Sequence, residues 1–216
     1  SPRNITDTVA RLNTAMELDD SVREYVGIPV TYSFGLGRIR AIAAAGGAFY
    51  LPERFDPVEI REMLLAGEIN AISAVPTLCR LILATPQVIG EAGRHVRWIE
   101  IGSQYMSGAE KAAMRDLFPN ARIIQHYGLT EASRSTFLDV SAAPEDQLES
   151  VGTARPPRSR SAPRARSAFA AIMSRWACCR ATGRSSRCVM PKAGCTPRTG
   201  ARSAMARCIS WGGWMT

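Results

Sequence analysis

The sequence lacks any run of about 18 apolar residues, the length that a bilayer-spanning helix requires, so no transmembrane helix is expected. Its first residues, Ser1-Pro2-Arg3-Asn4, contain neither an initiator methionine nor the apolar segment of a secretory signal. From such a start we expect a processed or truncated chain that is located in the cytoplasm.

Acidic residues are missing from the last part of the chain. Residues 158–216 hold eleven arginines and one lysine but no aspartate, glutamate or leucine, which gives a charge of +12. Residues 1–157 carry 15 basic and 19 acidic side chains, a charge of −4, so the total of +8 combines two different compositions. We therefore predict a globular domain over residues 1–157 and a basic, Arg- and Cys-rich tail over 158–216 that is not a native domain.

Two interpretations of the basic tail differ in function. Arginines without acidic neighbours neutralise phosphates, so the tail would bind nucleic acid without sequence preference. Zinc binding is disfavoured, because the tail has no Cys-x-x-Cys pair and the adjacent Cys178 and Cys179 are poorly spaced as ligands. The composition favours an irregular or disordered tail, for which nucleic acid contact is only a non-specific effect of charge.

Residues 1–157 alternate between strand-like and helix-like segments. Turn residues, helix caps and apolar spacing predict helices over 6–16, 38–45, 57–65, 77–83 and 109–118. Strand-like apolar segments occupy 25–32, 48–51, 71–75, 96–101 and 121–125. This alternation predicts an α/β fold with a doubly wound sheet, in which ligands bind at the carboxyl ends of the strands.

Two polar loops follow predicted strands and therefore belong at that edge. One is Gly102–Ser107 and the other begins at His126 and continues as Tyr127-Gly128-Leu129-Thr130-Glu131. In the second loop, an aromatic ring can stack on a nucleobase and a glycine allows close approach of backbone to a ligand. A hydroxyl can bond phosphate, and a carboxylate is a ligand that Mg²⁺ prefers. Five consecutive positions thus suit a magnesium nucleotide.

The pattern Tyr127-Gly128-Leu129-Thr130-Glu131 resembles the Tyr-Gly-x-Thr-Glu motif of the adenylate-forming (AMP-binding) enzymes, which include the acyl-CoA synthetases and luciferase-like proteins. Further landmarks stand in the family's order, namely Pro29–Gly35, Val75-Pro76-Thr77, Gly102–Ser107 and Val151-Gly152. The resemblance covers residues 1–157. It implies part of the N-terminal domain of such an enzyme.

The resemblance also implies roles for individual residues. Tyr127 would stack on adenine beside Gly128 and Leu129, while Thr130 would contact phosphate and Glu131 would bind Mg²⁺, which makes the last two the catalytic candidates.

Other residues of the implied site come from the two upstream landmarks. Ser103, Gln104 and Tyr105 would line the adenine and acyl pockets, with Gly102 and Tyr32 on the acyl side. Tyr32 stands where the family commonly has His, and Gln104-Tyr105 where it has Ala-Pro. The acid is therefore not predicted.

The implied activity is ATP-dependent activation of a small carboxylic acid to an acyl-adenylate, followed by transfer to CoA or a carrier protein. ATP or AMP, Mg²⁺ and CoA are the implied cofactors. The alternative is an inactive remnant or a binding module whose tail contacts polyanions. Adenylation domains of peptide synthetases and acyl-carrier-protein ligases remain open as sibling classes.

Several parts that the family uses are expected to be missing. Its phosphate-binding loop, which ends Pro-Lys-Gly, would precede Ser1, and its small lid with a catalytic lysine has no counterpart. Codons for residues 192–199, translated two bases later, permit Gly-Trp-Leu-His-Thr-x-Asp, the family's next motif, and those for 211–216 permit the one after. We therefore expect a frame-shifted tail and a chain that is inactive alone, because charge stabilisation dominates phosphoryl and adenylyl chemistry.

For three remaining residues we expect no catalytic or binding role. His126 is expected to be structural, His95 to lie on the surface or in a loop, and Cys79 to be a small buried residue of a helix.

Overall fold

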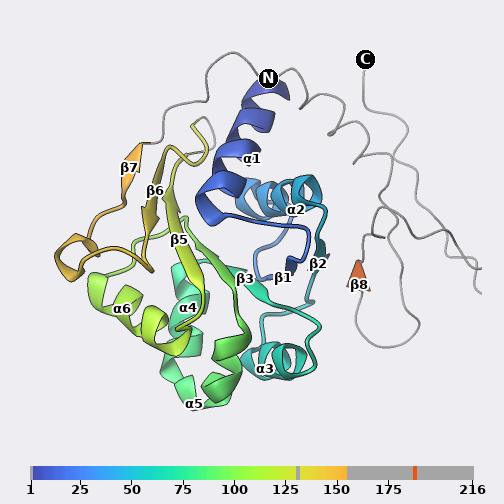
Figure 1. The fold of residues 1–216 in the computed structure, drawn as a ribbon, viewed down its shortest axis with the longest axis vertical. Coiled ribbons are helices and arrows are strands. Elements are labelled where there is room, and N and C mark those ends of the chain that lie inside the picture. The colour runs from blue at the N-terminus through green and yellow to red at the C-terminus, as the bar shows by residue number, and fades with distance from the viewer. Residues whose placement is uncertain (1, 130–131, 155–186, 189–216) are drawn as a thin grey trace, which may run out of the picture.

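The computed structural model describes residues 2–129, 132–154 and 187–188 and arranges them around one sheet with helices on both faces (Figure 1). The strands lie in the order β7-β6-β5-β4-β3-β1-β2-β8. Their bounds are β1 Arg23–Val26, β2 Ala48–Tyr50, β3 Ala71–Ala74, β4 Trp98–Ile101, β5 Arg122–Tyr127, β6 Thr136–Asp139, β7 Thr153–Ala154 and β8 Arg187–Cys188. The helices are α1 Pro2–Met16, α2 Ser33–Ala45, α3 Pro57–Leu65, α4 Pro76–Ala84, α5 Pro86–Ile89 and α6 Gly108–Leu117, with short 3-10 turns at Gly90–His95 and Glu145–Gln147.

The central strands confirm the predicted α/β class. The strands β2, β1, β3, β4 and β5 pair in parallel in that order, and a helix connects each to the next along the chain. The order reverses between β1 and β3, which is the point where doubly wound sheets open a crevice for ligands. The strands β6 and β7 extend the sheet beyond β5, and β8 extends it beyond β2, all by antiparallel pairing; none of the three was predicted.

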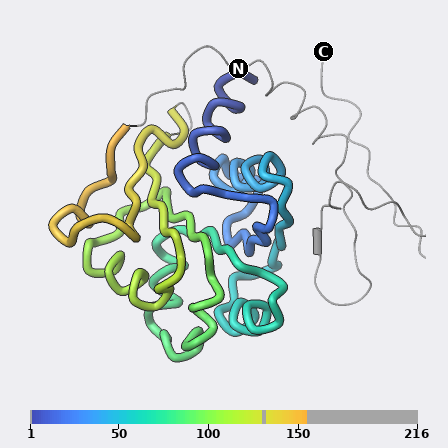
Figure 2. The backbone as a smooth tube through the Cα atoms, viewed as in Figure 1, coloured from blue at the N-terminus to red at the C-terminus, as the bar shows by residue number. Residues whose placement is uncertain are grey.

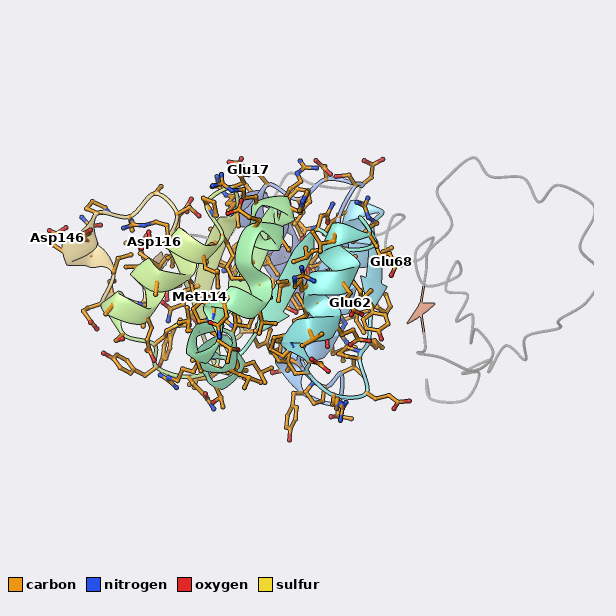
Figure 3. All side chains as sticks on the ribbon, turned by 90° about the horizontal axis from the view of Figure 1, so that it is seen from below. Glu17, Glu62, Glu68, Met114, Asp116 and Asp146 are labelled. Carbon is orange, nitrogen blue, oxygen red and sulfur yellow. The ribbon has the colours of Figure 1, made fainter. Side chains whose placement is uncertain are left out.

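Helices cover the two faces of the sheet unequally. One core cluster joins α1 and α2 to the sheet through Leu12, Met16 and Ile42, and the other lies under α3–α6 around Ile60, Ile82 and their neighbours. Figure 2 shows α1 and α2 lying together on one side of the sheet, with α1 beside β5. Charged side chains such as Glu62 of α3 and Asp116 of α6 point to solvent, as Figure 3 shows.

Three helix ends carry caps of the kind that their residues favour. The Asp56 side chain accepts a 2.9 Å hydrogen bond from the backbone of Val58 and caps α3, whose first residue is Pro57. Gly46 ends α2 with a φ of +86°, which favours glycine. Ser107 begins α6 with a complete capping box.

Two helices begin several residues earlier than predicted, and the first is α1, which starts at Pro2 rather than Thr6. Helix α2 starts at Ser33 rather than near Arg38, because Gly35 and Gly37 are helical despite their low intrinsic propensity. A Cβ atom at Gly35 would lie 2.5 Å from the carbonyl oxygen of Pro29, so close packing requires glycine there. The predicted strand over 25–32 was correspondingly too long, since the chain after Val26 turns into this helix.

The predicted tail falls mostly outside the described residues. Its described part is β8, whose two residues pair with Phe49 and Tyr50 of β2, where the prediction had only irregular chain. Among the helices that the structure describes, none is long and apolar enough to cross a membrane.

Candidate functional site

The exposed tyrosines gather at the carboxyl edge of the parallel strands. Tyr32 follows β1, Tyr105 follows β4 and Tyr127 ends β5, with exposed fractions of 65%, 67% and 50%. The other two tyrosines, Tyr25 and Tyr50, are buried in the sheet. The three exposed rings thus lie at the edge where sheets of this kind bind ligands.

The loop after β4 is constrained by hydrogen bonds at successive residues. Thr77, in the first turn of α4, donates a 2.7 Å bond to Gln104 Oε1, and Arg80 donates a 3.0 Å bond to the carbonyl of Tyr105. The hydroxyl of Tyr105 donates to Glu149 at 2.8 Å, and this bond raises the pKa of the tyrosine.

Backbone strain marks the same loop. Ser103 has a φ of +78°, a conformation that residues with a Cβ seldom adopt and that clusters at functional sites. Ser103, Gln104 and Tyr105 are all exposed, so their polar atoms are available to a ligand.

The turn after β5 is closed by a pair of backbone hydrogen bonds. Leu129 and Ala132 each donate to the other's carbonyl at 3.2 Å. A Cβ atom at Gly128 would lie 2.4 Å from the backbone nitrogen of Arg134, so the turn requires glycine at this position. Thr130 and Glu131, the predicted catalytic and metal-binding pair, lie outside the described residues.

The two loops meet through a glycine and a histidine. Ile101 pairs with Gln125 across the parallel strands, so Gly102 and His126 stand side by side. A Cβ atom at Gly102 would lie 2.2 Å from Cε1 of the His126 ring. Ser103, two residues after β4, and Tyr127, the last residue of β5, therefore lie at the ends of neighbouring strands.

His126 has the structural environment that was predicted for it. It is 7% exposed and packs edge-on against Phe34, with ring centroids 4.6 Å apart. Burial lowers its pKa below the usual value, although Glu100 acts in the opposite direction. Its Nδ1 lies 2.7 Å from Glu100 Oε1 without satisfying hydrogen-bond geometry. The other predictions hold too: His95 is exposed and Cys79 is fully buried.

Four buried charges below the site were not predicted. Glu24 of β1, Arg38 of α2, Glu100 of β4 and Arg134 of the turn are each at most 3% exposed. The available signal was a single glutamate within each of two apolar strands, Arg23–Val26 and Trp98–Ile101, since charged residues are seldom buried without partners.

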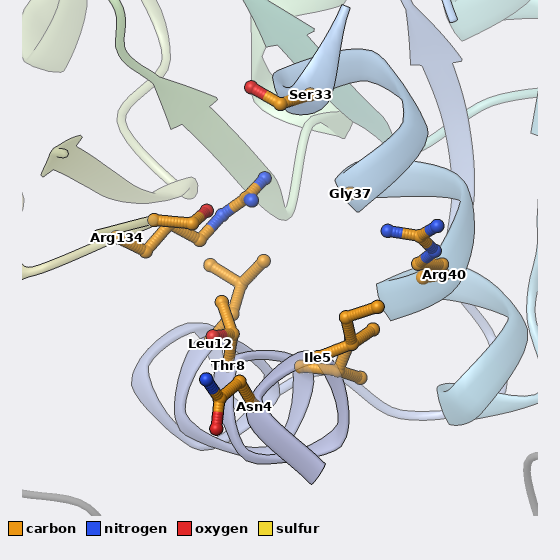
Figure 4. Close-up of a pocket in the computed structure, with 10 residues that line it drawn as sticks. Asn4, Ile5, Thr8, Leu12, Ser33, Gly37, Arg40 and Arg134 are labelled. Atoms are coloured by element: carbon orange, nitrogen blue, oxygen red, sulfur yellow. The ribbon is translucent and has the colours of Figure 1, made fainter. Parts of the chain in front are cut away.

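A cavity of about 350 Å³ opens between α1, α2 and the end of the turn after β5 (Figure 4). Its walls include Thr8 and Leu12 from α1, Arg40 from α2, and Ser133 with Arg134. The volume is typical of a small-molecule site. Tyr32 and Gly102, the predicted acyl-pocket residues, do not line this cavity, and neither do the described residues of the predicted nucleotide set.

Comparison with known proteins gives a class for this fold and site. Residues 1–160 match the family described as AMP-binding enzyme, which is most of the chain. The chain belongs to this family. No curated protein matches the sequence.

Solved structures with the same fold include VinN bound to L-aspartate, at 19% identity and a TM-score of 0.57 over 68% of this chain and 37% of VinN. ATP-bound MatB from Rhodopseudomonas palustris is 20% identical, with a TM-score of 0.58 over 69% of this chain and 30% of MatB. The long-chain-fatty-acid-CoA ligase FadD1 from Archaeoglobus fulgidus is 17% identical, with a TM-score of 0.59 over 70% and 32%. The chain thus spans about a third of the length of these proteins.

Proposed function

We propose that this chain contributes the nucleotide and acid sites of an ATP-dependent carboxylic acid ligase, which forms an acyl-adenylate and then a CoA thioester. The observation that carries the proposal is the contact of Gly102 with His126, which brings the loop after β4 beside the turn after β5. Both loops lie at the ligand-binding edge of the sheet, and membership of the AMP-binding family supports an adenine nucleotide as the ligand.

In this proposal the adenine ring stacks on Tyr127, whose half-exposed ring is already positioned at the end of β5. Gln104 faces the same edge and would bond the base, because Thr77 orients its side-chain amide. Ser103 offers a strained, exposed backbone to the ligand. Thr130 would contact the α-phosphate, the role that the family motif assigns to it.

The acid would occupy the cavity between α1 and α2. Ser133 and Arg134, which line it, come two and three residues after the motif, so an acid held there would present its carboxylate close to the nucleotide. Leu12 and Val9 supply an apolar wall. Arg40 adds a cation that forms no ion pair among the described residues, and burial lowers its pKa.

The residues present fit an adenine nucleotide better than they define a metal site. An exposed ring, a fixed amide and a strained loop are the features that a nucleobase and ribose need. Within the described ranges no three His, Cys, Asp or Glu side chains converge on one point. Mg²⁺ would accordingly bind through nucleotide phosphates and the Glu131 carboxylate, as it does in many phosphate sites, and would neutralise phosphate charge.

Binding of AMP to the intact chain tests this proposal. Calorimetric titration should detect AMP, and Tyr127→Ala should weaken it about tenfold, since stacking of a base on an aromatic ring contributes about 1–3 kcal/mol. Tyr127→Phe is the matched control and should retain affinity, because it keeps the ring. Equal affinities of the alanine variant and the parent chain would contradict the assignment of Tyr127.

Turnover is a separate matter from binding. Because the chain spans about a third of each matched structure, we propose that it does not release pyrophosphate from ATP in response to added acids. Acid-dependent pyrophosphate release by the purified chain, abolished by Glu131→Ala, would overturn this.

Polyanion binding is a second candidate function, and the positive charge of residues 158–216 favours it. The net charge of +12 over residues 158–216 favours binding to polyanions. If this alone accounts for the protein, arbitrary DNA should bind with an affinity that falls steeply with salt, and a chain ending at Pro157 should lose it. An AMP-binding chain whose DNA affinity is negligible at physiological salt would exclude this alternative.

A further inference from the structure

The buried charges beneath the site form one connected network. Glu100 Oε2 lies 2.8 Å from Arg38 Nη1, and Glu100 Oε1 accepts a 2.8 Å bond from Arg134 Nε. Arg38 also pairs with Glu24, whose Oε1 accepts a 2.8 Å hydrogen bond from Arg38 Nε. Burial opposes ionisation of Glu100, yet Arg134 and Arg38 keep its pKa well below the usual value. The negative charges of the two carboxylates and the positive charges of the two guanidinium groups therefore cancel, and the His126 beside them is neutral.

Arg134 is the member of this network that belongs to the turn rather than to the sheet or a helix. Its φ is +53°, so its backbone is held in a conformation that side chains disfavour. Its guanidinium also donates to the carbonyl of Phe34 at 3.5 Å and lies 5.5 Å over the Phe34 ring. Its own carbonyl accepts a 3.0 Å bond from Arg11. Both ends of the residue are thus fixed by distant elements.

Helix α2 leaves room for this side chain. A Cβ atom at Gly37 would lie 2.5 Å from Arg134 Nη1, so a glycine at this position admits the guanidinium. A glycine is also required at position 128, where a Cβ atom would strike the Arg134 backbone. Two glycines from separate segments are therefore fitted to one arginine.

The position of Arg134 determines the base of the turn. Gly128 packs on its nitrogen, and the paired bonds between Leu129 and Ala132 close the turn immediately before it. The Ser135 hydroxyl adds a 2.7 Å bond to the carbonyl of Ala132. Glu100, the partner of Arg134, stands two residues before Gly102 on the neighbouring strand. One ion pair thus connects the two loops of the proposed site.

We propose that Arg134 is a positioning residue: its buried ion pair with Glu100 sets the turn after β5 in register with the loop after β4, and so keeps Tyr127 and Ser103 arranged for one ligand. That the ligand is a nucleotide rests on the proposed function; the arrangement of the turn does not. Stability alone gives a weak reason for such a pair, because apolar residues of similar size often replace buried ion pairs without loss.

A set of charge-matched variants tests this role. Arg134→Met and Glu100→Gln each leave one buried charge unbalanced, whereas the double variant restores neutrality without the ion pair. Glu24→Gln is the matched control, because it removes a buried carboxylate that contacts Arg38 and not Arg134. Arg134→Lys keeps the charge but not the forked contact, and serves if Arg134→Met does not fold.

Two readouts separate positioning from stability. Amide exchange at Leu129 and Ala132 should accelerate about tenfold in the double variant, as expected when a local segment opens more readily, while Ile72 and Ile123 in the core strands keep their protection. AMP affinity should fall by a similar factor, because only the fraction with an ordered turn binds. Glu24→Gln should lower the unfolding midpoint without changing either value.

The results decide the proposal in each case. A double variant, or an Arg134→Lys variant, with the parent's turn exchange and AMP affinity would overturn it, as would Glu24→Gln that accelerates exchange at the turn equally. If the parent chain binds no AMP, the proposed function fails, but the exchange rates at Leu129 and Ala132 still test whether Arg134 positions the turn.

Discussion

The imidazole ring of His126 fills the space that a side chain at position 102 would need. A Cβ atom there would lie 2.2 Å from Cε1 and 2.4 Å from Nε2 of the ring. Because Phe34 packs on the same ring at 4.6 Å, the histidine has little freedom to move away. The absence of a side chain at Gly102 therefore allows the loop after β4 to pack directly against His126 of β5.

Substitution Gly102→Ala should be destabilising for this reason. We expect a loss of about 1–3 kcal/mol in the free energy of unfolding, the usual cost of forcing extra atoms into a packed site, together with weaker AMP binding. Chemical denaturation and calorimetry measure the two effects. Gly108→Ala is the control, since its Cβ would meet nothing closer than the Glu149 carboxylate at 3.2 Å and the Leu148 Cβ at 3.3 Å, distances that a shift of a few tenths of an ångström relieves. Equal losses for both variants would contradict this account.

Substitution Gly37→Ala tests the fit between α2 and Arg134. Alanine normally stabilises a helix interior by about 0.5–1 kcal/mol relative to glycine, but here it would lie 2.5 Å from the arginine, so we expect the opposite sign. The loss should shrink when Arg134→Met is present, because the branched end of the side chain is gone. Denaturation of the two single variants and the double variant measures this coupling. Additive effects would show that the arginine is not what excludes a side chain.

Substitution Ser107→Ala should remove the capping box of α6. The Ser107 hydroxyl accepts from the backbone of Glu110 at 3.3 Å, and Glu110 accepts from the backbone of Ser107 at 2.8 Å. We expect a loss of about 1 kcal/mol, the usual value for an N-cap, measured by chemical denaturation. Thr14→Ala is the control, because its exposed hydroxyl only bonds the carbonyl one turn earlier. A loss equal to that of the control would show that the cap contributes nothing.

Most of the central fold could be predicted from interactions between residues that are close together in the sequence. Asp56 before Pro57, the Gly46-Gly47 pair and Ser107 act at helix ends through neighbours in sequence, so the sequence suffices to place them. The start of α2 was misplaced because the need for glycine at position 37 comes from Arg134, almost a hundred residues later. The strand β6 was missed for a related reason, since Thr136–Asp139 is short and is recognised only by its pairing with β5.

The candidate site was predicted unevenly. Tyr127 and the Ser103–Tyr105 segment could be proposed from the sequence because a local motif and a strand end mark them; the structure places both at one edge, and their roles stay predictions. The buried network was not predicted, because Glu24 and Glu100 form their ion pairs with Arg38 and Arg134, which lie on other elements. The cavity was missed as well, since α1 and α2 form it only once they pack together.

The pH dependence of stability should report on His126. Its folded pKa is lowered from the usual value of 6.5, mainly by burial. The unfolded chain therefore binds a proton more readily than the folded one, and stability must fall as pH decreases through 6.5. From pH 6.5 to 5.5 one histidine can contribute at most about 1 kcal/mol to this fall.

The chain has only two histidines, which makes the attribution direct. His126→Phe keeps an aromatic ring against Phe34 and removes the titration, so its free energy of unfolding should change little between pH 6.5 and 5.5. His95→Gln removes the exposed histidine instead and should retain the parent's dependence. Urea denaturation at closely spaced pH values measures both slopes. If His95→Gln flattened the curve and His126→Phe did not, burial would not lower the pKa of His126, and the attribution of the pH dependence to the buried histidine would fail.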